Sequence, residues 1–179
     1  MHTISQKDNL RFQVIRGFQT GYLEPVAHFV CWKLKNDWDD YNELYHATKY
    51  FDGLLKNPNL WIDSHLIMHD DQIKGCLFLV GGAISGIEPK YPIEDEPTAL
   101  SLKYFHILDK GRGLGRFWLN EVVMPYYAER GFKRIYVNSS HPQSFPFYLR
   151  FGEEICRYNK VSDIGGIPRE GRSFLLKLE

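Results

Sequence analysis

Residues 105–118 read Phe-His-Ile-Leu-Asp-Lys-Gly-Arg-Gly-Leu-Gly-Arg-Phe-Trp. The apolar beginning is typical of a β-strand, and the alternate glycines at 111, 113 and 115 precede an amphipathic segment typical of a helix. Glycine permits backbone angles and close approaches that a side chain would block. Amides at a helix N-terminus favour phosphate, and Lys110, Arg112 and Arg116 add positive charge. The stretch therefore predicts a strand, a loop and a helix that together bind a pyrophosphate.

Two common phosphate-binding loops do not match this stretch. A P-loop requires Lys-Ser or Lys-Thr after its glycines, and none is present, so a magnesium-nucleotide site is disfavoured. The dinucleotide fingerprint Gly-x-Gly-x-x-Gly has a different spacing, and it normally opens a βαβ unit with an acidic residue about twenty positions later. A nucleotide-binding domain that uses this glycine loop remains an alternative, and affinity for ATP or NAD without affinity for acyl-CoA would reveal it.

The loop resembles motif A of the GCN5-related N-acetyltransferase (GNAT) superfamily, Arg/Gln-x-x-Gly-x-Gly/Ala. Lys110 stands in place of the usual Arg or Gln and keeps a positive charge there. The resemblance implies that backbone amides around Phe105, His106 and Ile107 hold the pantetheine arm of acetyl-CoA. It also implies that the following loop holds the pyrophosphate through Lys110, Gly111, Arg112, Gly113, Leu114, Gly115 and Arg116.

The downstream sequence resembles motif B of the same superfamily. A β-rich run at 132–138 is followed by a short segment that ends in Phe147-Tyr148, and then by Phe151-Gly152 where the family more often has Gly-Phe. The family tyrosine matches Tyr148, and the small residue before it matches Ser144, which we expect at the cofactor. The resemblance implies that Tyr148 lies near the coenzyme A sulfur and protonates the departing thiolate. A phenol suits this role because it is protonated at neutral pH.

The hydrophobic pattern predicts the remaining elements. We expect strands at 10–16, 60–68, 73–80 and 99–107, two helices within 25–56, and an acidic loop at 85–97. The break at Asn36-Asp37 separates these helices, with Asp37 as a cap, and Pro125 predicts a kink in a helix that ends at Gly131. Strands at 154–158 and 173–178 enclose a polar loop at 159–172. The pattern alone indicates an α/β or α+β protein, and the resemblance implies a mixed, twisted, mostly antiparallel sheet with helices on both faces and splayed central strands.

Composition narrows the class of protein. The 179 residues fit one domain spanning 1–179, and 22 basic residues balance 22 acidic ones, which disfavours a nucleic-acid partner. The three cysteines are far apart and have no metal-ligand spacing, while His65 and His69 are separated on a predicted strand, so no metal is expected. Without an apolar leader at the first residues or a membrane-length apolar run, we expect a cytoplasmic protein with no membrane partner. Homodimer formation is left open.

The general base is the least determined part of the site. The strand 99–107 carries no carboxylate, and His106 is its one side chain that titrates near neutral pH, so His106 is the candidate base. Strand alternation leaves a second outcome open, in which His106 points into the core. The acidic residues 94–96 either attract a cationic acceptor or form a solvated loop, and the aromatic residues between 32 and 51 either fill the core or line the acceptor pocket.

The sequence thus predicts an acetyl-CoA-dependent N-acetyltransferase that acts by direct attack of a small-molecule or peptide amine on the thioester. Direct transfer needs no cysteine nucleophile. The rival is a non-catalytic acyl-CoA-binding or sensor module on the same fold, which the lack of a carboxylate on strand 99–107 favours.

Overall fold

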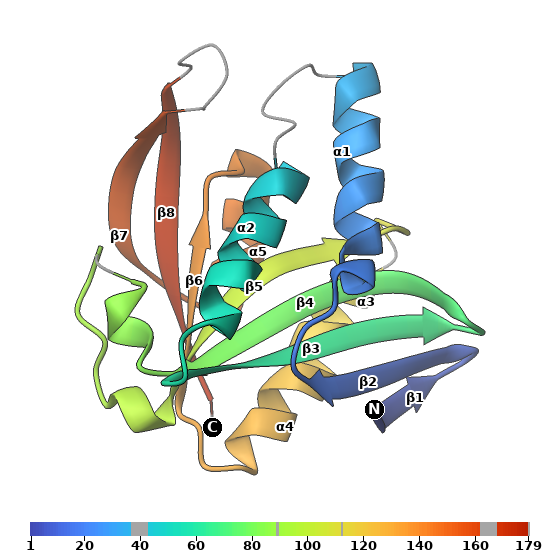
Figure 1. Ribbon diagram of the computed structural model, residues 1–179, viewed down its shortest axis with the longest axis horizontal. Helices are drawn as coiled ribbons and strands as arrows, with labels where there is room; N and C mark the ends of the chain where they lie inside the picture. Colours follow the sequence, from blue (N-terminus) through green and yellow to red (C-terminus); the bar gives the residue numbers. More distant parts are fainter. Residues whose placement is uncertain (37–42, 89, 112, 162–167, 179) are drawn as a thin grey trace.

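A mixed eight-stranded sheet forms the centre of the molecule in the computed structural model, which describes residues 1–36, 43–88, 90–111, 113–161 and 168–178 (Figure 1). The strands are β1 (His2–Lys7), β2 (Leu10–Arg16), β3 (Leu60–His69), β4 (Gln72–Gly82), β5 (Ala99–Ile107), β6 (Arg134–Ser139), β7 (Gly152–Val161) and β8 (Pro168–Lys177). Their order is β1-β2-β3-β4-β5-β6-β8-β7, and every neighbouring pair is antiparallel except β5 and β6, which are parallel. This sheet confirms the predicted fold class.

Helices cover both faces of the sheet. The α-helices are α1 (Glu24–Asn36), α2 (Glu43–Leu55), α3 (Leu114–Phe117), α4 (Met124–Ala128) and α5 (Phe145–Tyr148). A π-helical segment, η4 (Trp118–Val123), joins α3 to α4, and short 3₁₀ turns are η1 (Thr20–Leu23), η2 (Ile84–Gly86), η3 (Glu96–Thr98) and η5 (Pro142–Ser144). α1 and α2 lie on one face, and the helical run from α3 to α4 lies on the other together with α5 (Figure 1).

The central strands are buried on both faces because they separate two apolar cores. In β4 the run Cys76–Val80 is fully buried. Leu77 and Leu79 join the core beneath α3–α4, while Cys76, Phe78 and Val80 join the core beneath α1 and α2. The continuous apolar run of β4 is therefore explained by burial on two sides.

β5 and β6 stop pairing with each other half-way along β5. Their parallel pairing extends from Ala99 opposite Arg134 to Leu102 opposite Val137. β5 then continues to Ile107 and β6 to Ser139 without pairing to each other. In Figure 1 the strands β1–β5 fan away from β6–β8 beyond this point. The splayed central strands implied by the resemblance are present.

A bulge in β5 lies at the start of this gap. Cys76 of β4 pairs with His106, but Phe78 pairs with Lys103, so β5 holds one residue more than β4 over this interval. Tyr104 takes up the extra length with a left-handed φ of 50°, which is unusual for a bulky residue. Before the bulge Leu102 faces the α3–α4 core, and after it Phe105 does. After the bulge, therefore, each side chain points to the opposite face of the sheet from the one that strict alternation would give it.

The helical run after the glycine loop, where a kink at Pro125 is expected, accommodates this proline through a π-helical segment. Proline has no N–H to donate to the preceding turn. η4 widens that turn, with the Met124 amide donating to the Leu119 carbonyl five residues back, and α4 then begins with Pro125 in its first turn. Gly131 has a φ of 83° at the end, where the Phe132 amide donates to the Tyr127 carbonyl at 3.1 Å. The predicted glycine cap is confirmed.

The structure differs from the predicted elements chiefly in one omitted strand and in the ends of two others. The prediction omits β1, which pairs with β2 at the edge of the sheet. It also treats 159–172 as a loop, whereas β7 continues to Val161 and β8 begins at Pro168. β1 and β7 are edge strands, and the first residues of β8 pair with β7 alone, so these segments carry little hydrophobic pattern. The separation of α1 from α2 agrees with the prediction, while the expected Asp37 cap lies outside the described residues.

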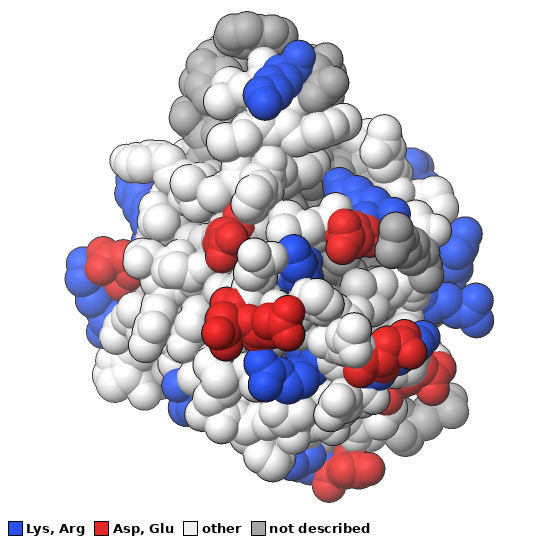
Figure 2. Space-filling view, turned by 90° about the vertical axis from the view of Figure 1, so that its right-hand side faces the viewer, with Lys and Arg blue, Asp and Glu red and all other residues white. Residues whose placement is uncertain are grey.

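The face shown in Figure 2 carries charges of both signs. Lys and Arg side chains lie interspersed with Asp and Glu side chains there, in keeping with the balanced composition. Among the described helices, none has the length and apolar character needed to cross a membrane.

A buried polar network joins β3 to α4 behind the sheet. The Tyr127 hydroxyl donates to Asp63 at 2.8 Å, and the His65 Nε2 atom lies 2.8 Å from the same hydroxyl. Because Tyr127 donates to Asp63, its oxygen accepts from His65, which is neutral. Burial lowers the pKa of His65 to about 3. The i,i+4 histidine pair is therefore split between this network and the surface, where His69 contacts Asp70.

The His65 network predicts a loss of stability in mild acid. Because the pKa of His65 is lowered on folding, the unfolded chain binds more protons below pH 6.5, and the free energy of unfolding falls by about 2 kcal/mol between pH 7 and pH 5 from this residue alone. Urea denaturation of His65→Gln should show a shallower loss over this range than wild type. The exposed His2→Gln is the control. An equal pH dependence in the His65 variant would contradict the assignment.

Candidate active site

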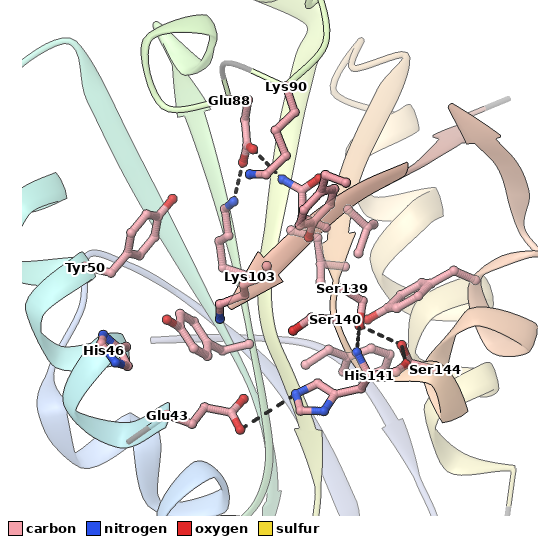
Figure 3. A pocket seen from close by; sticks show the side chains of 18 of the residues that line it. Glu43, His46, Tyr50, Glu88, Lys90, Lys103, Ser139, Ser140, His141 and Ser144 are labelled. Atoms are coloured by element: carbon pink, nitrogen blue, oxygen red, sulfur yellow. Dashed lines mark hydrogen bonds and ion pairs between the residues drawn. The ribbon is translucent and has the colours of Figure 1, made fainter. Parts of the chain in front are cut away.

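A cavity of about 570 Å³ occupies the gap between β5 and β6 (Figure 3). The side chains that line it come from α2, from the segment after β4, from β5 and β6, from the segment after β6 with α5, and from β7. They include Glu43, His46, Tyr50, Glu88, Lys90, Lys103, Tyr104, Phe105, His106, Asn138, Ser139, His141, Ser144, Tyr148, Tyr158 and Lys160. The parting of the two strands thus creates a pocket at the centre of the sheet.

Glu88 is the most enclosed charge in this cavity, with a relative exposure of 1%. Ser101 donates to one of its carboxylate oxygens at 2.6 Å, and Lys103 donates to the same oxygen. Asn138 of β6 donates to the other oxygen. Burial lowers the pKa of Lys103, although the charge of Glu88 partly offsets this effect. Glu88 therefore ties β5 to β6 at the point where they separate.

Glu43 occupies another part of the cavity wall. It is the first described residue of α2, and its Oε1 lies 3.1 Å from His106 Nε2 on β5. Its Oε2 lies 3.9 Å from Nε2 of His141, which follows β6. Burial raises the pKa of the Glu43 carboxyl, but the hydrogen bond and charge of His106, with the charges of His141 and Lys33, outweigh it and leave the pKa below its ordinary value. This carboxylate is ionised at neutral pH.

The glycine loop connects β5 to α3 at the end of the gap. Gly111 and Gly113 have φ values of 89° and 71°, and a Cβ atom at either position would meet nothing within 4 Å. Gly115 packs more closely, since its Cβ would lie 3.3 Å from Ile107. The Phe117 amide donates to the Gly113 carbonyl at 3.0 Å, so the described helical hydrogen bonding begins at the glycine loop. The loop thus presents open backbone at a helix start.

The cations of the loop take different positions. The Lys110 ammonium lies 4.7 Å from the centre of the Phe29 ring on α1. Burial lowers the pKa of Lys110, and the charge of Glu43 partly offsets it. Arg112 lies outside the described residues. Neither Lys110 nor Arg116 lines the cavity.

Tyr148 and Ser144 lie on the β6 side of the gap. Tyr148 is 7% exposed, lines the cavity and packs against Phe174 with 5.4 Å between ring centres. Burial raises the pKa of its phenol, which keeps the hydroxyl protonated. The Ser144 hydroxyl lies 2.7 Å from that of Ser139 and donates to the His141 carbonyl at 2.8 Å. These bonds fix the turn that precedes α5.

Comparison with known proteins gives a match at the level of structure. Neither a family model nor a curated protein sequence matches the chain. Similar solved structures include a GNAT-family protein from Desulfovibrio desulfuricans, with a TM-score of 0.57 and 16% identity over 94% of this chain and 99% of that one. An acetyl transferase from Salmonella typhimurium that modifies the N-terminal serine of ribosomal protein L7/L12 gives a TM-score of 0.61 and 16% identity over 99% and 100%. YncA from the same organism, solved with acetyl-CoA, gives 0.52 and 12% over 94% of each chain.

The chain has the GNAT fold. This fold includes β5, the glycine loop and α3 in the order expected for motif A, and β6 with α5 in the order expected for motif B. At these identities the likeness establishes the fold, and the activity has to be argued from the site itself.

The GNAT fold brings some of the predicted site residues together and leaves others apart. Phe105, His106, Ser144 and Tyr148 line the cavity. Ile107 instead packs into the α3–α4 core, and the loop residues 110–116 that the structure describes lie outside the cavity wall. Among the candidate acidic residues 94–96, none lines it: Glu96 bonds Ser85, while the other two contact Lys133 and Arg134.

Sequence reasoning missed Glu43, Glu88 and Lys103. Glu88 stands in an acidic loop rich in proline, where nothing distinguishes it from its solvated neighbours. An acid in the first turn of a helix, such as Glu43, is ordinarily read as favouring the helix dipole. A lysine inside an otherwise apolar strand is the one signal that indicates a buried partner for Lys103.

The pair formed by Glu88 and Lys103 predicts a large stability effect. Glu88→Leu leaves the Lys103 ammonium buried without its partner, which we expect to lower the free energy of unfolding by about 3–5 kcal/mol in urea denaturation. Adding Lys103→Met to this variant should restore most of the lost free energy of unfolding. Asp52→Ala removes the exposed pair with Lys56 and should cost about 1 kcal/mol or less. A Glu88→Leu loss no larger than that of Asp52→Ala would contradict this account.

Proposed function

We propose that the chain is an acetyl-CoA-dependent N-acetyltransferase that acetylates a primary amine by direct attack on the thioester. The observation that carries this proposal is the gap between β5 and β6, which has the glycine loop at its end and Tyr148 on its wall. An L7/L12-modifying acetyl transferase of the same fold supports a peptide amine as acceptor, and a small-molecule amine is the other candidate.

The residues present fit acetyl-CoA as the donor. Open backbone at Gly111 and Gly113 accepts a pyrophosphate, because free amides and positive φ values at a helix start leave room for oxygen atoms. Unpaired backbone of β5 beyond Leu102 offers hydrogen bonds to the pantetheine arm. Amides around Phe105–Ile107 would polarise the thioester carbonyl and stabilise the oxyanion. Ser144 would border the donor on the β6 side.

The reaction then has a defined course. The neutral amine attacks the thioester carbon, a C–N bond forms, and the C–S bond breaks with its electrons on sulfur. His106 takes the proton that the acceptor ammonium must lose before the attack, and Tyr148 donates its proton to the departing thiolate. The nitrogen loses its second proton once the C–N bond has formed, and this proton restores the Tyr148 hydroxyl. The products are the acetylated amine and coenzyme A, with one proton released to solvent.

The rival is an acyl-CoA sensor without catalysis. Its main support is the absence of a carboxylate from β5. Glu43 and Glu88 weaken this support, because both bring carboxylates to the cavity from other elements. Release of free coenzyme A thiol with a panel of amines separates the two functions, since binding without turnover would favour the sensor.

The glycine loop yields the first kinetic prediction. Gly113→Asp places a negative side chain where the pyrophosphate would bind, so we expect acetyl-CoA affinity to be lost in calorimetry. Gly131→Asp is a matched control, because Gly131 also has a positive φ and open space but lies at the other end of the helix. If the two folded variants bind acetyl-CoA equally well, the motif A assignment is wrong.

Tyr148 yields the second kinetic prediction. Tyr148→Phe should lower kcat by roughly 10²–10⁴-fold with little change in KM, because protonation of the thiolate develops in the transition state. The loss should shrink with an acyl donor whose leaving thiol is more acidic. Tyr126→Phe on α4 serves as control. An unchanged kcat in Tyr148→Phe would leave this residue a packed aromatic only.

A further inference from the structure

Glu43 connects the two parted strands across the mouth of their gap. From α2 its carboxylate reaches His106 on β5 at 3.1 Å and His141 after β6 at 3.9 Å. Figure 3 shows Glu43 extending from α2 toward His141. The Glu43 and His106 side chains are only 16% and 13% exposed, and both line the cavity. A carboxylate and an imidazole are therefore held together beside the proposed reaction centre.

This contact determines which His106 nitrogen is able to act as a base. A neutral imidazole has one N–H and one lone pair. Because an ionised carboxylate only accepts, Nε2 carries the hydrogen and donates it to Glu43, and Nδ1 carries the lone pair. Glu43 also stabilises the positive charge that appears when Nδ1 takes a proton. Within the described residues no hydrogen bond occupies His106 Nδ1.

We propose that Glu43 is the positioning residue of the base, holding His106 so that Nδ1 faces the acceptor amine and stabilising the imidazolium that forms. This inference rests on the proposed acetyltransfer. The acceptor ammonium gives one proton to Nδ1, its nitrogen attacks the thioester, and the imidazolium later releases that proton to solvent. The Nε2–H bond to Glu43 remains in place throughout.

The surrounding charges are consistent with this role. His141 and Lys33 act on Glu43 from the β6 side and from α1, and Lys110 acts from the glycine loop. Phe29 of α1 covers His106 with 5.0 Å between ring centres. Burial lowers the pKa of His141, which leaves His106 with a neutral neighbour near pH 7.

Glu88 is the competing base in the cavity. Its two oxygens already accept from Ser101, Lys103 and Asn138, so its charge is matched and its lone pairs are engaged. A proton taken up by Glu88 would displace at least one of these donors, whereas Nδ1 of His106 has no hydrogen-bond partner among the described residues. The geometry therefore favours His106 with Glu43.

The test compares Glu43→Gln, Glu43→Asp and the exposed control Glu129→Gln by steady-state kinetics over pH 5–9. Glutamine keeps a hydrogen-bond acceptor but removes the charge. We expect kcat to fall on the order of 10–100-fold with KM for acetyl-CoA unchanged, partial recovery in Glu43→Asp, and no change in Glu129→Gln. In a His106→Gln background, Glu43→Gln should cause no further loss, because Glu43 acts through His106.

Nitrogen NMR of the His106 ring gives a readout that does not depend on activity, and we expect the tautomer with hydrogen on Nε2 and none on Nδ1 in the wild type. An active wild type with unchanged kinetics in Glu43→Gln, or a wild-type ring with its hydrogen on Nδ1, overturns the role of Glu43 and leaves the proposed function standing. Acetyl-CoA binding in calorimetry without turnover of any amine overturns the proposed function, and this inference with it.

Discussion

The bulge at Tyr104 is the constraint on which the site depends. Without it, strict alternation along β5 would place His106 on the same face as Leu100 and Leu102, inside the α3–α4 core. One extra residue with a left-handed backbone reverses the alternation, so that Phe105 fills this core and His106 faces α1 and α2. A bulky residue with positive φ costs about 1–2 kcal/mol. Packing of the Tyr104 ring against Phe51, 5.5 Å between centres, helps to hold it.

The gap beside this bulge leaves part of β5 without a paired strand on the β6 side. A sheet buried on both faces must satisfy its backbone polar groups, yet β5 stops pairing with β6 after Leu102. Glu88 bridges the two strands where pairing ends, and Glu43 spans the wider part from α2. Contacts between polar side chains thus link the two strands where their backbone pairing has ended. In the proposed enzyme, the pantetheine arm would occupy the remaining edge and complete its hydrogen bonds.

Much of the architecture follows from local pattern, and the polar interior does not. The glycine loop, β5, α5 and the Gly131 cap have strong local signals, since glycines and apolar periodicity act within a few residues. β1 and β7 carry little pattern because they are edge strands, and the first residues of β8 pair only with β7. The Tyr104 bulge has no signature in a strand rich in aromatic residues. Glu43 and Glu88 meet His106 and Lys103 through contacts more than ten residues apart, which no local pattern encodes.

A crystal structure with acetyl-CoA is the most direct test of the central claim, that the gap between β5 and β6 is the acyl-donor site. The account predicts the pyrophosphate against the amides of the glycine loop, the pantetheine arm along β5 beyond Leu102, and the thioester between His106 and Tyr148. Acetyl-CoA bound elsewhere on the protein, with the gap filled only by water, would contradict it.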